Sequence, residues 1–405
     1  MRTPFLAPLA AGLAFASGAN AEWPTCGHVD AFPGADWRQT DPGRRGWDEA
    51  QLDAARQIFS GQPSAAVMVV HRGRQIAAWG DVSARYTAQS VRKGLLSSLV
   101  GQLVGDGRLQ LDATLEEMGV DDVSPALTPA ERQATLGDLL RSRSGIFHSA
   151  LYEVGGWTRM RRALGERERE AGRDLYPPGA YWIYNNWDFN ALGTIVERAA
   201  GEEIGPLFAR RIAAPTRMQD FRPEHVEYTT SDHPAEQRFG NVSSHRAYVF
   251  DISTRDLARY GLLYMNCGRW GRTQVVPRDW VLASIDGPDT RNGRGPDEQD
   301  TGFGGYGYLW QIDKPGMRRF AALNTREPSY FATGARGHVM GVFPALDLVI
   351  VHQVATVGGV GIEAQMRRFQ QGSPEVSEEQ VAALFAAVIR AHPDAASAFE
   401  TPQAP

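Results

Sequence analysis

The segment QSVRKG, residues 89–94, is the most informative part of the sequence, because it places a lysine three residues after a serine. Lys93 and Lys314 are the only lysines among 42 basic residues, and all the others are arginines. An arginine cannot release its proton near neutral pH, whereas a desolvated lysine shifts its pKa readily and can take part in proton transfer. The spacing puts Ser90 and Lys93 one helical turn apart, as a serine nucleophile with an assisting lysine requires. Taken alone, the motif also fits a chance occurrence, which is expected about one time in ten.

The residues after this motif predict a helix over 90–104, because apolar side chains recur there at helical spacing. The segment Gly105-Asp106-Gly107 ends it. We therefore expect a mostly buried helix with Ser90 on its first turn. The apolar stripe consists of Leu96, Leu99, Val100 and Leu103.

The order of the predicted elements defines the fold class. A β-hairpin is predicted before the helix, residues 108–250 read as helical and loop-rich, and strands return near the C-terminus. An antiparallel sheet assembled from both ends of the chain, flanked by helices and with a helical lobe inserted, satisfies this order, so we predict an α+β fold. The predicted hairpin covers 65–79, the later strands cover 307–312, 319–323, 339–343 and 348–354, and the last amphipathic helix covers 378–391.

The N-terminus predicts a cleavable signal peptide over residues 1–21. It has Arg2 at its positive start, an apolar segment over 5–16 and the small-residue site Ala19-Asn20-Ala21. We therefore expect a periplasmic or secreted protein without a membrane span in the mature chain. The expected division is an arm over 22–50, a catalytic domain over 51–391 and a polar tail over 392–405. Within that domain we expect a sheet lobe from 51–89 and 306–391, a helical lobe over about 90–285 and a flexible loop over 286–305.

Composition narrows the class of partner. The net charge of −5 and the absence of a dense Lys/Arg run argue against nucleic-acid binding. The nine histidines are scattered, and no Cys/His cluster has metal-ligand spacing, so we expect no metal and no cofactor. The oligomeric state does not follow from the sequence.

The two cysteines, Cys26 and Cys267, fit an exported protein. In an oxidising compartment they are a plausible disulfide, which would tie the N-terminal arm to the body of the protein. Two unpaired thiols are the alternative.

The segment Tyr184-Asn185-Asn186 precedes a predicted helix over 188–200. Residues i and i+2 of an extended segment project to one side, so Tyr184 and Asn186 can face one cavity. The phenolate of a Tyr is stabilised by a nearby Lys ammonium, and it is then a credible general base for a serine hydroxyl. A Tyr packed under a helix start is the alternative.

Two glycine-containing segments complete the set of motifs. Residues 332–338, ATGARGH, lead into a predicted strand, and a glycine-rich turn beside an edge strand can present a backbone N–H to a reacting carbonyl. The loop Ser144-Gly145-Ile146 is followed by His148 and Tyr152. Each segment taken alone is equally consistent with an ordinary turn or surface loop.

In this order and spacing the motifs resemble those of the class C β-lactamase-like serine hydrolases, over roughly residues 46–391. The resemblance implies the fold shared by β-lactamases and penicillin-binding proteins. Within that group, residues 184–190 and Tyr152 look most similar to the 6-aminohexanoate-dimer hydrolase and esterase branch.

The resemblance also implies roles. Ser90 is expected to be the acylated nucleophile, and Lys93 to hold Ser90 and Tyr184 in a charged hydrogen-bond network. Tyr184 is expected to act as the base in acylation and to activate water in deacylation, and Asn186 to bind Lys93 and the substrate. The backbone N–H groups of Ser90 and Ala335 are expected to form the oxyanion hole. Substrate contacts are expected from Tyr152, Gly334, Arg336, His338 and His245.

One departure from the family pattern bears on the substrate. β-Lactamases carry Lys-Thr-Gly or His-Thr-Gly where this chain has Ala332-Thr333-Gly334, so a cation for a substrate carboxylate is missing unless Arg336 or His338 replaces it. This favours a hydrolase of a small amide or ester. A β-lactamase or D-alanyl-D-alanine carboxypeptidase, and a catalytically silent binding module, are the alternatives.

Overall fold

The structure is a computed structural model. The residues that it describes are 23–123, 125–153, 173, 176–288, 290, 304–315, 317, 320, 323, 325–355, 361–364, 367 and 374–399. The predicted signal peptide lies outside this part of the chain, as do most of the loop predicted over 286–305 and most of the strand predicted over 319–323. Within the described residues, no helix combines the length and the apolar character needed to cross a membrane.

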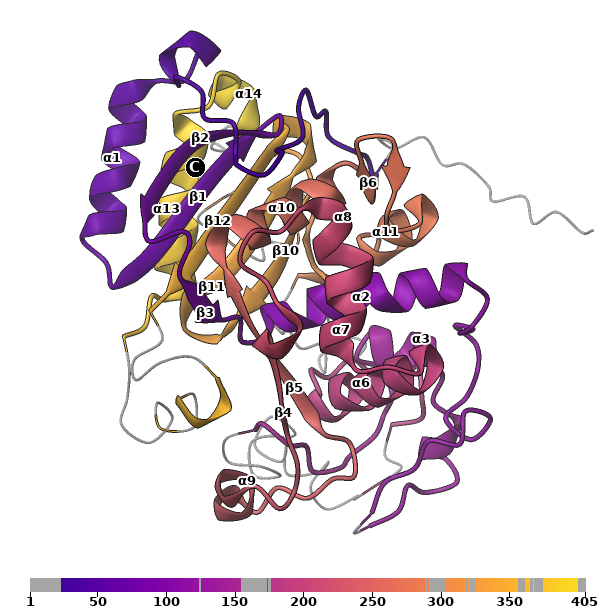
Figure 1. The fold of residues 1–405 in the computed structure, drawn as a ribbon. Coiled ribbons are helices and arrows are strands. Elements are labelled where there is room, and N and C mark those ends of the chain that lie inside the picture. Colours follow the sequence, from indigo (N-terminus) through magenta and orange to yellow (C-terminus); the bar gives the residue numbers. More distant parts are fainter. Residues whose placement is uncertain are drawn as a thin grey trace, which may run out of the picture.

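The largest sheet has seven antiparallel strands in the order β2-β1-β12-β11-β10-β9-β8 and occupies the upper left of the molecule in Figure 1. β1 pairs with β12 from Ser64↔Val354 to His71↔Leu348, so the first hairpin of the chain lies beside the last strand. The predicted α+β fold with an antiparallel sheet built from both ends is confirmed. The strands are β1 (Ser64–His71), β2 (Arg74–Gly80), β8 (Gly305–Tyr306), β9 (Gln311–Asp313), β10 (Ser329–Gly334), β11 (His338–Phe343) and β12 (Leu348–Val354).

The hairpin of β1 and β2 turns at Arg72 and Gly73, which have φ values of 51° and 78°. Two consecutive left-handed residues suit the right-handed twist of the flanking strands. A Cβ at Gly73 would lie 1.8 Å from the Ala31 carbonyl oxygen, so the position also requires glycine because the N-terminal arm passes directly over it.

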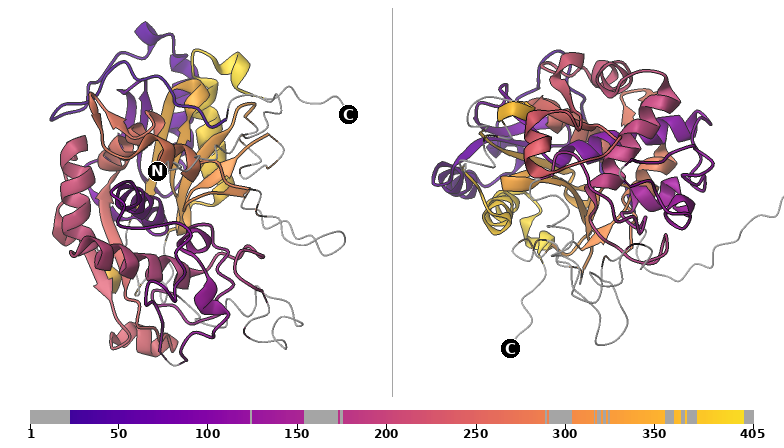
Figure 2. Two further views of the ribbon diagram at one scale, coloured as in Figure 1. Left: turned by 90° about the vertical axis from the view of Figure 1, so that its right-hand side faces the viewer. Right: turned by 90° about the horizontal axis from the view of Figure 1, so that it is seen from below.

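The sheet is buried on both faces. Met68 and Val70 of β1 belong to one apolar core, while Val67 and Val69 point to the other. α1 (Glu49–Ser60) and α13 (Glu378–Arg390) cover the second face, and α2 (Val91–Gly105) and α10 (Thr254–Met265) lie against the first. Both views in Figure 2 show the sheet between these two sets of helices.

The middle of the chain forms the helical lobe, which also contains a small antiparallel sheet of order β3-β5-β4 that the sequence analysis did not predict. The strands are β3 (Arg85–Thr87), β4 (Val226–Thr229) and β5 (Ala247–Ser253), with a separate pair β6 (Arg269–Trp270) and β7 (Thr273–Gln274). The helices are α3 (Leu136–Leu140), α6 (Asn186–Ala200), α7 (Ile204–Phe208), α8 (Ala214–Thr216), α9 (Pro234–Phe239) and α11 (Arg278–Ser284), with α14 (Ala395–Ala398) near the C-terminus.

Several boundaries differ from the predictions. The predicted strand over 307–312 overlaps only β9, because residues 307–310 form a bend between β8 and β9. β10 was missed because its second half, Thr333-Gly334, reads as the start of a turn. β11 was expected at an edge but lies in the interior of the sheet between β10 and β12. The expected arm boundary between residues 50 and 51 falls inside α1, which begins after its N-cap Asp48.

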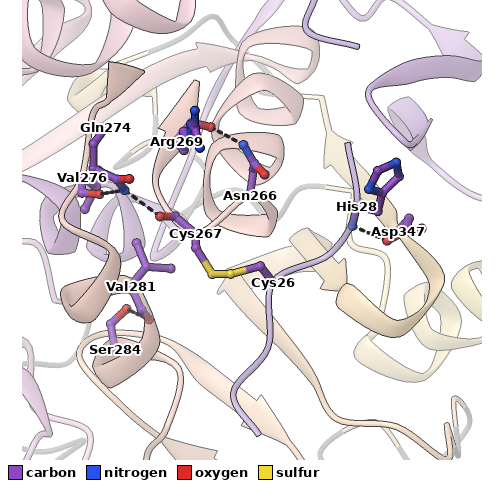
Figure 3. Close-up of a disulfide and its surroundings, with 10 residues drawn as sticks. All are labelled: Cys26, His28, Asn266, Cys267, Arg269, Gln274, Val276, Val281, Ser284 and Asp347. Atoms are coloured by element: carbon purple, nitrogen blue, oxygen red, sulfur yellow. Dashed lines mark hydrogen bonds between the residues drawn. A yellow bond between two sulfur atoms is a disulfide. The ribbon is translucent and has the colours of Figure 1, made fainter. Parts of the chain in front are cut away.

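A disulfide joins Cys26 in the N-terminal arm to Cys267 after α10, with 5.5 Å between the two Cα atoms (Figure 3). The arm is also held by hydrogen bonds from the buried Arg259, which donates to the carbonyl oxygens of Gly34 and Ala35. The arm therefore provides hydrogen-bond acceptors for the buried guanidinium of Arg259 in α10.

Candidate active site

Ser90 lies at the N-terminus of α2, immediately after Gln89, whose φ of 52° is left-handed. The residues of α2 from Val91 to Leu103 are all buried, so the first turn of this helix is held rigidly between the sheet and the helical lobe. Ser90 is the N-cap residue, yet its side chain accepts no hydrogen bond from the helix N–H groups. The half-buried hydroxyl is therefore available for other partners.

Lys93 is the centre of the hydrogen-bond network at this helix. Its Nζ donates to Ser90 Oγ at 2.8 Å and to Tyr184 Oη at 2.5 Å. The same ammonium lies 4.4 Å from the centroids of the Tyr184 and Phe189 rings. At 2% exposure the cation is removed from water, and two hydroxyls and two aromatic faces surround it. The structure thus brings together Ser90, Lys93 and Tyr184, as the sequence predicted.

Tyr184 is placed by the start of α6. Asn185 caps this helix by accepting from Trp187 N at 3.0 Å, and its amide nitrogen donates to the Ile146 carbonyl at 2.9 Å. Asn185 is extended, with φ −121° and ψ 114°, and Asn186 is the first helical residue and is half-buried. The capping bonds therefore tie the Tyr184 segment to the loop that follows Ser144.

Asp188 is a residue of this region that the sequence analysis did not identify. Its Oδ1 accepts from Ser144 Oγ at 2.6 Å and from Asn185 Nδ2 at 3.3 Å. Burial raises the pKa of this carboxyl well above its usual range. An acidic residue in the first turn of a predicted helix was the only available signal, and it reads as ordinary helix capping.

Gly334, the last residue of β10, packs against the turn that carries the serine. A Cβ at this position would lie 3.1 Å from Ser90 N and 2.8 Å from the Ala88 carbonyl oxygen, so only glycine allows this approach. The exposed Ala335 follows, and Arg336 and Gly337 have φ values of 71° and 97°. This turn places its backbone next to the amide of Ser90.

The β10–β11 turn is fixed from outside by His352 of β12, another residue that the sequence analysis missed. Its Nδ1 donates to the Gly337 carbonyl at 2.5 Å, and its Nε2 lies 2.7 Å from Ser64 Oγ. Because a carbonyl only accepts, Nδ1 carries the proton. Burial lowers the pKa of His352 to about 4, so the ring is neutral at pH 7.

Two histidines expected to contact substrate are buried. His245 is 1% exposed, with Nδ1 at 3.0 Å from Thr194 Oγ1 and its ring against Trp187. Burial lowers its pKa to about 4. His338 is fully buried at the first position of β11. His245 is therefore packed against other side chains of the lobe, and its contact with a substrate stays a prediction.

Tyr152 and Arg336 remain candidates. Tyr152 is 9% exposed and left-handed, with φ 61°, and its N–H donates to Glu236 Oε1 at 2.9 Å. Arg336 is half-buried beside the exposed Ala335. Within the described ranges, no group of three or more His, Cys, Asp or Glu side chains could hold a metal ion.

Comparison with known proteins identifies the family. A family model described as Beta-lactamase matches residues 51–371, most of the chain. The chain therefore belongs to the β-lactamase family, as its motifs predicted.

Solved structures share the fold at low sequence identity. A Bacillus anthracis protein assigned as a 6-aminohexanoate-dimer hydrolase has a TM-score of 0.57 and 15% identity, over 90% of this chain and 88% of that one. A variant of simvastatin synthase from Aspergillus terreus has a TM-score of 0.53 and 16% identity, over 85% and 94%. A β-lactamase from Mycobacterium bovis has a TM-score of 0.50 and 19% identity, over 82% and 96%. The predicted β-lactamase-like fold is confirmed.

Proposed function

We propose that this chain is an exported serine hydrolase that cleaves an amide or ester bond of a small substrate through an acyl-enzyme on Ser90. The observation that carries the proposal is the buried Lys93 ammonium, which donates to Ser90 Oγ and Tyr184 Oη. A nucleophile and a base that share one cation are the parts that covalent acyl transfer requires.

Acylation begins with Tyr184 as the phenolate, which the Lys93 ammonium stabilises. Tyr184 Oη takes the proton of Ser90 while Oγ attacks the substrate carbonyl. The backbone N–H groups of Ser90 and Ala335 receive the oxyanion. Collapse of the tetrahedral intermediate transfers the proton to the leaving amine or alcohol and leaves the acyl group on Ser90. Tyr184 then activates a water molecule that hydrolyses the ester, while Asn186 holds the substrate.

The proposed preference for uncharged substrates is based on Ala332, the residue before Thr333. Ala332 is 3% exposed and points at α2, where a Cβ on Gly94 would approach its methyl group to 3.2 Å. The closing strand therefore offers an apolar contact where related enzymes carry a cation. A substrate carboxylate there would lose its hydration without gaining a countercharge. We therefore propose uncharged acyl groups as the preferred substrates.

Steady-state kinetics test this function. The panel contains p-nitrophenyl esters, a linear amide dimer, nitrocefin and a D-Ala-D-Ala peptide, each assayed with the wild type and with Ser90→Ala. We expect the wild type to hydrolyse esters or amides with a higher kcat/KM than nitrocefin or the peptide. We expect Ser90→Ala to lose this activity. If only nitrocefin or only the peptide were hydrolysed, the protein would be a β-lactamase or a carboxypeptidase instead. If no substrate were hydrolysed, a binding module would be favoured.

A further inference from the structure

The guanidinium of Arg92 is buried beside Lys93 without the partners that a buried cation usually has. Arg92 is 1% exposed. Its Nη2 donates to Asn190 Oδ1 at 3.5 Å, while Nε and Nη1 have no hydrogen-bond partner. Its Cζ lies 4.4 Å from the centroid of the Tyr248 ring and 5.7 Å from that of Tyr152. Aromatic rings thus enclose a charge that lacks most of its hydrogen bonds.

Among the described residues, the polar side chain bonded to Arg92 is the neutral amide of Asn190, and none of the ion pairs between them includes Arg92. A buried lysine would respond by releasing its proton, but an arginine keeps its charge. Burying an uncompensated charge is costly, and an apolar side chain of similar volume is usually as stable or more stable in such a place. Arg92 is therefore not explained by a gain in folding stability, because an apolar side chain would stabilise the fold at least as well.

In the region of Arg92, burial opposes the negative charge of Tyr248, Tyr306 and Asp188. Burial raises the pKa of Tyr248 to about 12, although Arg92 opposes this shift, so Tyr248 is neutral at pH 7. Burial also raises the pKa of Tyr306, which packs against Tyr184, and of Asp188. The other charged or titratable groups of the surrounding elements are Lys93, Tyr152, Glu236 and Glu197. Glu236 accepts hydrogen bonds from Tyr152 N and from Asn241, and Glu197 forms an ion pair with Arg246.

Arg92 is linked to the proposed site through α6. Arg92 contacts Asn190 of this helix, and Lys93 contacts the preceding residue, Phe189. Asn190 Nδ2 donates to the Leu151 carbonyl at 3.0 Å, next to the left-handed Tyr152. Arg92 and Lys93 therefore contact consecutive residues of α6, and the Arg92 guanidinium also faces the ring of Tyr152, the candidate substrate contact.

We propose that Arg92 is a positioning residue whose permanent buried charge stabilises the negative charge that Tyr184 and the oxyanion carry in turn during acyl transfer. The inference rests on the proposed function, because that charge arises only if Tyr184 is the base for Ser90. Lys93 touches the reacting hydroxyls, and Arg92 adds a second cation that does not touch them. Two fixed cations in a dry site raise the phenolate population more than one does.

The test substitutes Arg92→Met, which keeps an unbranched side chain and removes the charge. We expect the thermal midpoint to stay unchanged or to rise, because a poorly satisfied buried charge is lost. We expect kcat and kcat/KM for p-nitrophenyl acetate to fall together by about 10- to 100-fold at pH 7, with KM within about threefold, since the charge acts on the transition state. The deficit should shrink as the pH rises, because higher pH restores the phenolate that the missing charge no longer favours.

Arg259→Met is the matched control. Arg259 is equally buried, but its Nη1 and Nη2 donate to the carbonyl oxygens of Gly34, Thr216 and Ala35. Its loss should lower the thermal midpoint and leave kcat of the folded fraction unchanged. The two arginines should therefore give opposite patterns of stability and activity.

Two results would overturn the inference. Arg92→Met with wild-type kcat at pH 7 would show that the charge is not used. A loss of kcat accompanied by a lower thermal midpoint, and constant across pH, would make Arg92 a structural residue. Wild-type acylation of Ser90 remains measurable in either case, so failure of this inference is distinguishable from failure of the proposed function.

Discussion

Lys93 donates two hydrogen bonds from a single ammonium group, an arrangement that an arginine side chain does not reproduce. Its ammonium donates at once to Ser90 Oγ and Tyr184 Oη, and the rings of Tyr184 and Phe189 flank it. A compact, tetrahedral donor fits between two hydroxyls, whereas a planar guanidinium is larger and presents its N–H groups in a fixed fork.

We therefore predict that Lys93→Arg lowers kcat nearly as much as Lys93→Ala, by about 100-fold or more, although the charge is kept. The comparison uses kcat for p-nitrophenyl acetate, with far-UV circular dichroism as the control for folding. Near-normal turnover of the arginine variant would show that position 93 needs a positive charge alone.

Arg336 is the side chain that could bind a substrate carboxylate in place of the missing cation. It stands two residues after Gly334, in a left-handed turn at the mouth of the proposed oxyanion hole. We predict poor nitrocefin turnover relative to p-nitrophenyl acetate, and no change in the ratio of their kcat/KM values in Arg336→Ala. Efficient nitrocefin turnover that collapses in this variant would identify Arg336 as a bidentate carboxylate anchor and the chain as a β-lactamase.

The spacing of Ser90, Lys93 and Tyr184 in the sequence predicted residues that the fold brings into contact, because the first two share a helical face and the third precedes a helix. His352 and Arg92 could not be found in this way. Their contributions depend on neighbours from other elements, such as the Gly337 carbonyl and the Tyr248 ring.

At the scale of elements, the site depends on the contact between the start of α2 and the end of β10. A Cβ at Gly334 would lie 2.7 Å from Gln89 Cβ and 3.1 Å from Ser90 N. The backbone of one element must therefore move if the other gains a methyl group. This contact sets the relative position of the nucleophile and the proposed oxyanion donors.

We predict that Gly334→Ala lowers kcat by at least about tenfold, because one displaced oxyanion donor alone costs that much or more. The loss of stability should be about 1–3 kcal/mol, as is usual for overpacking. Stopped-flow acylation rates and urea unfolding measure the two effects. Gly341→Ala is the control, since it adds a methyl group between aromatic rings of the core rather than beside Ser90.

The elements that the sequence predicted well have strong local signals. α2 has an apolar stripe and a glycine stop, and the first hairpin has its turn glycine. The elements that were missed lack such signals. β3 is three residues long, and β10 ends in residues typical of a turn. Their strand conformation comes from pairing with distant partners, which a single sequence does not display.

At the scale of the whole molecule, the disulfide closes a loop of 241 residues between the arm and the end of α10. The arm contacts Met265 at the end of α10 and Arg72 in the first hairpin, and it supplies carbonyl acceptors to Arg259. Cross-links across long loops restrict the unfolded chain most strongly. The disulfide should therefore stabilise the fold without entering the chemistry.

We predict that Cys26→Ser combined with Cys267→Ser lowers the free energy of unfolding by up to about 5 kcal/mol. The kcat of the folded protein should stay within about twofold of the wild type. Chemical denaturation and assays at low temperature measure the two quantities. A large loss of kcat in fully folded protein would place the arm in the catalytic machinery.

Every step of the proposed reaction requires Ser90 to carry the acyl group. The most direct test of this requirement is mass spectrometry of protein that is mixed with p-nitrophenyl acetate, quenched in acid within seconds and digested. We predict the added mass of one acetyl group on the peptide that contains Ser90, and none in Ser90→Ala. An acetyl group that appears on another residue and persists in Ser90→Ala, or turnover by that variant above about one per cent of the wild type, would contradict it.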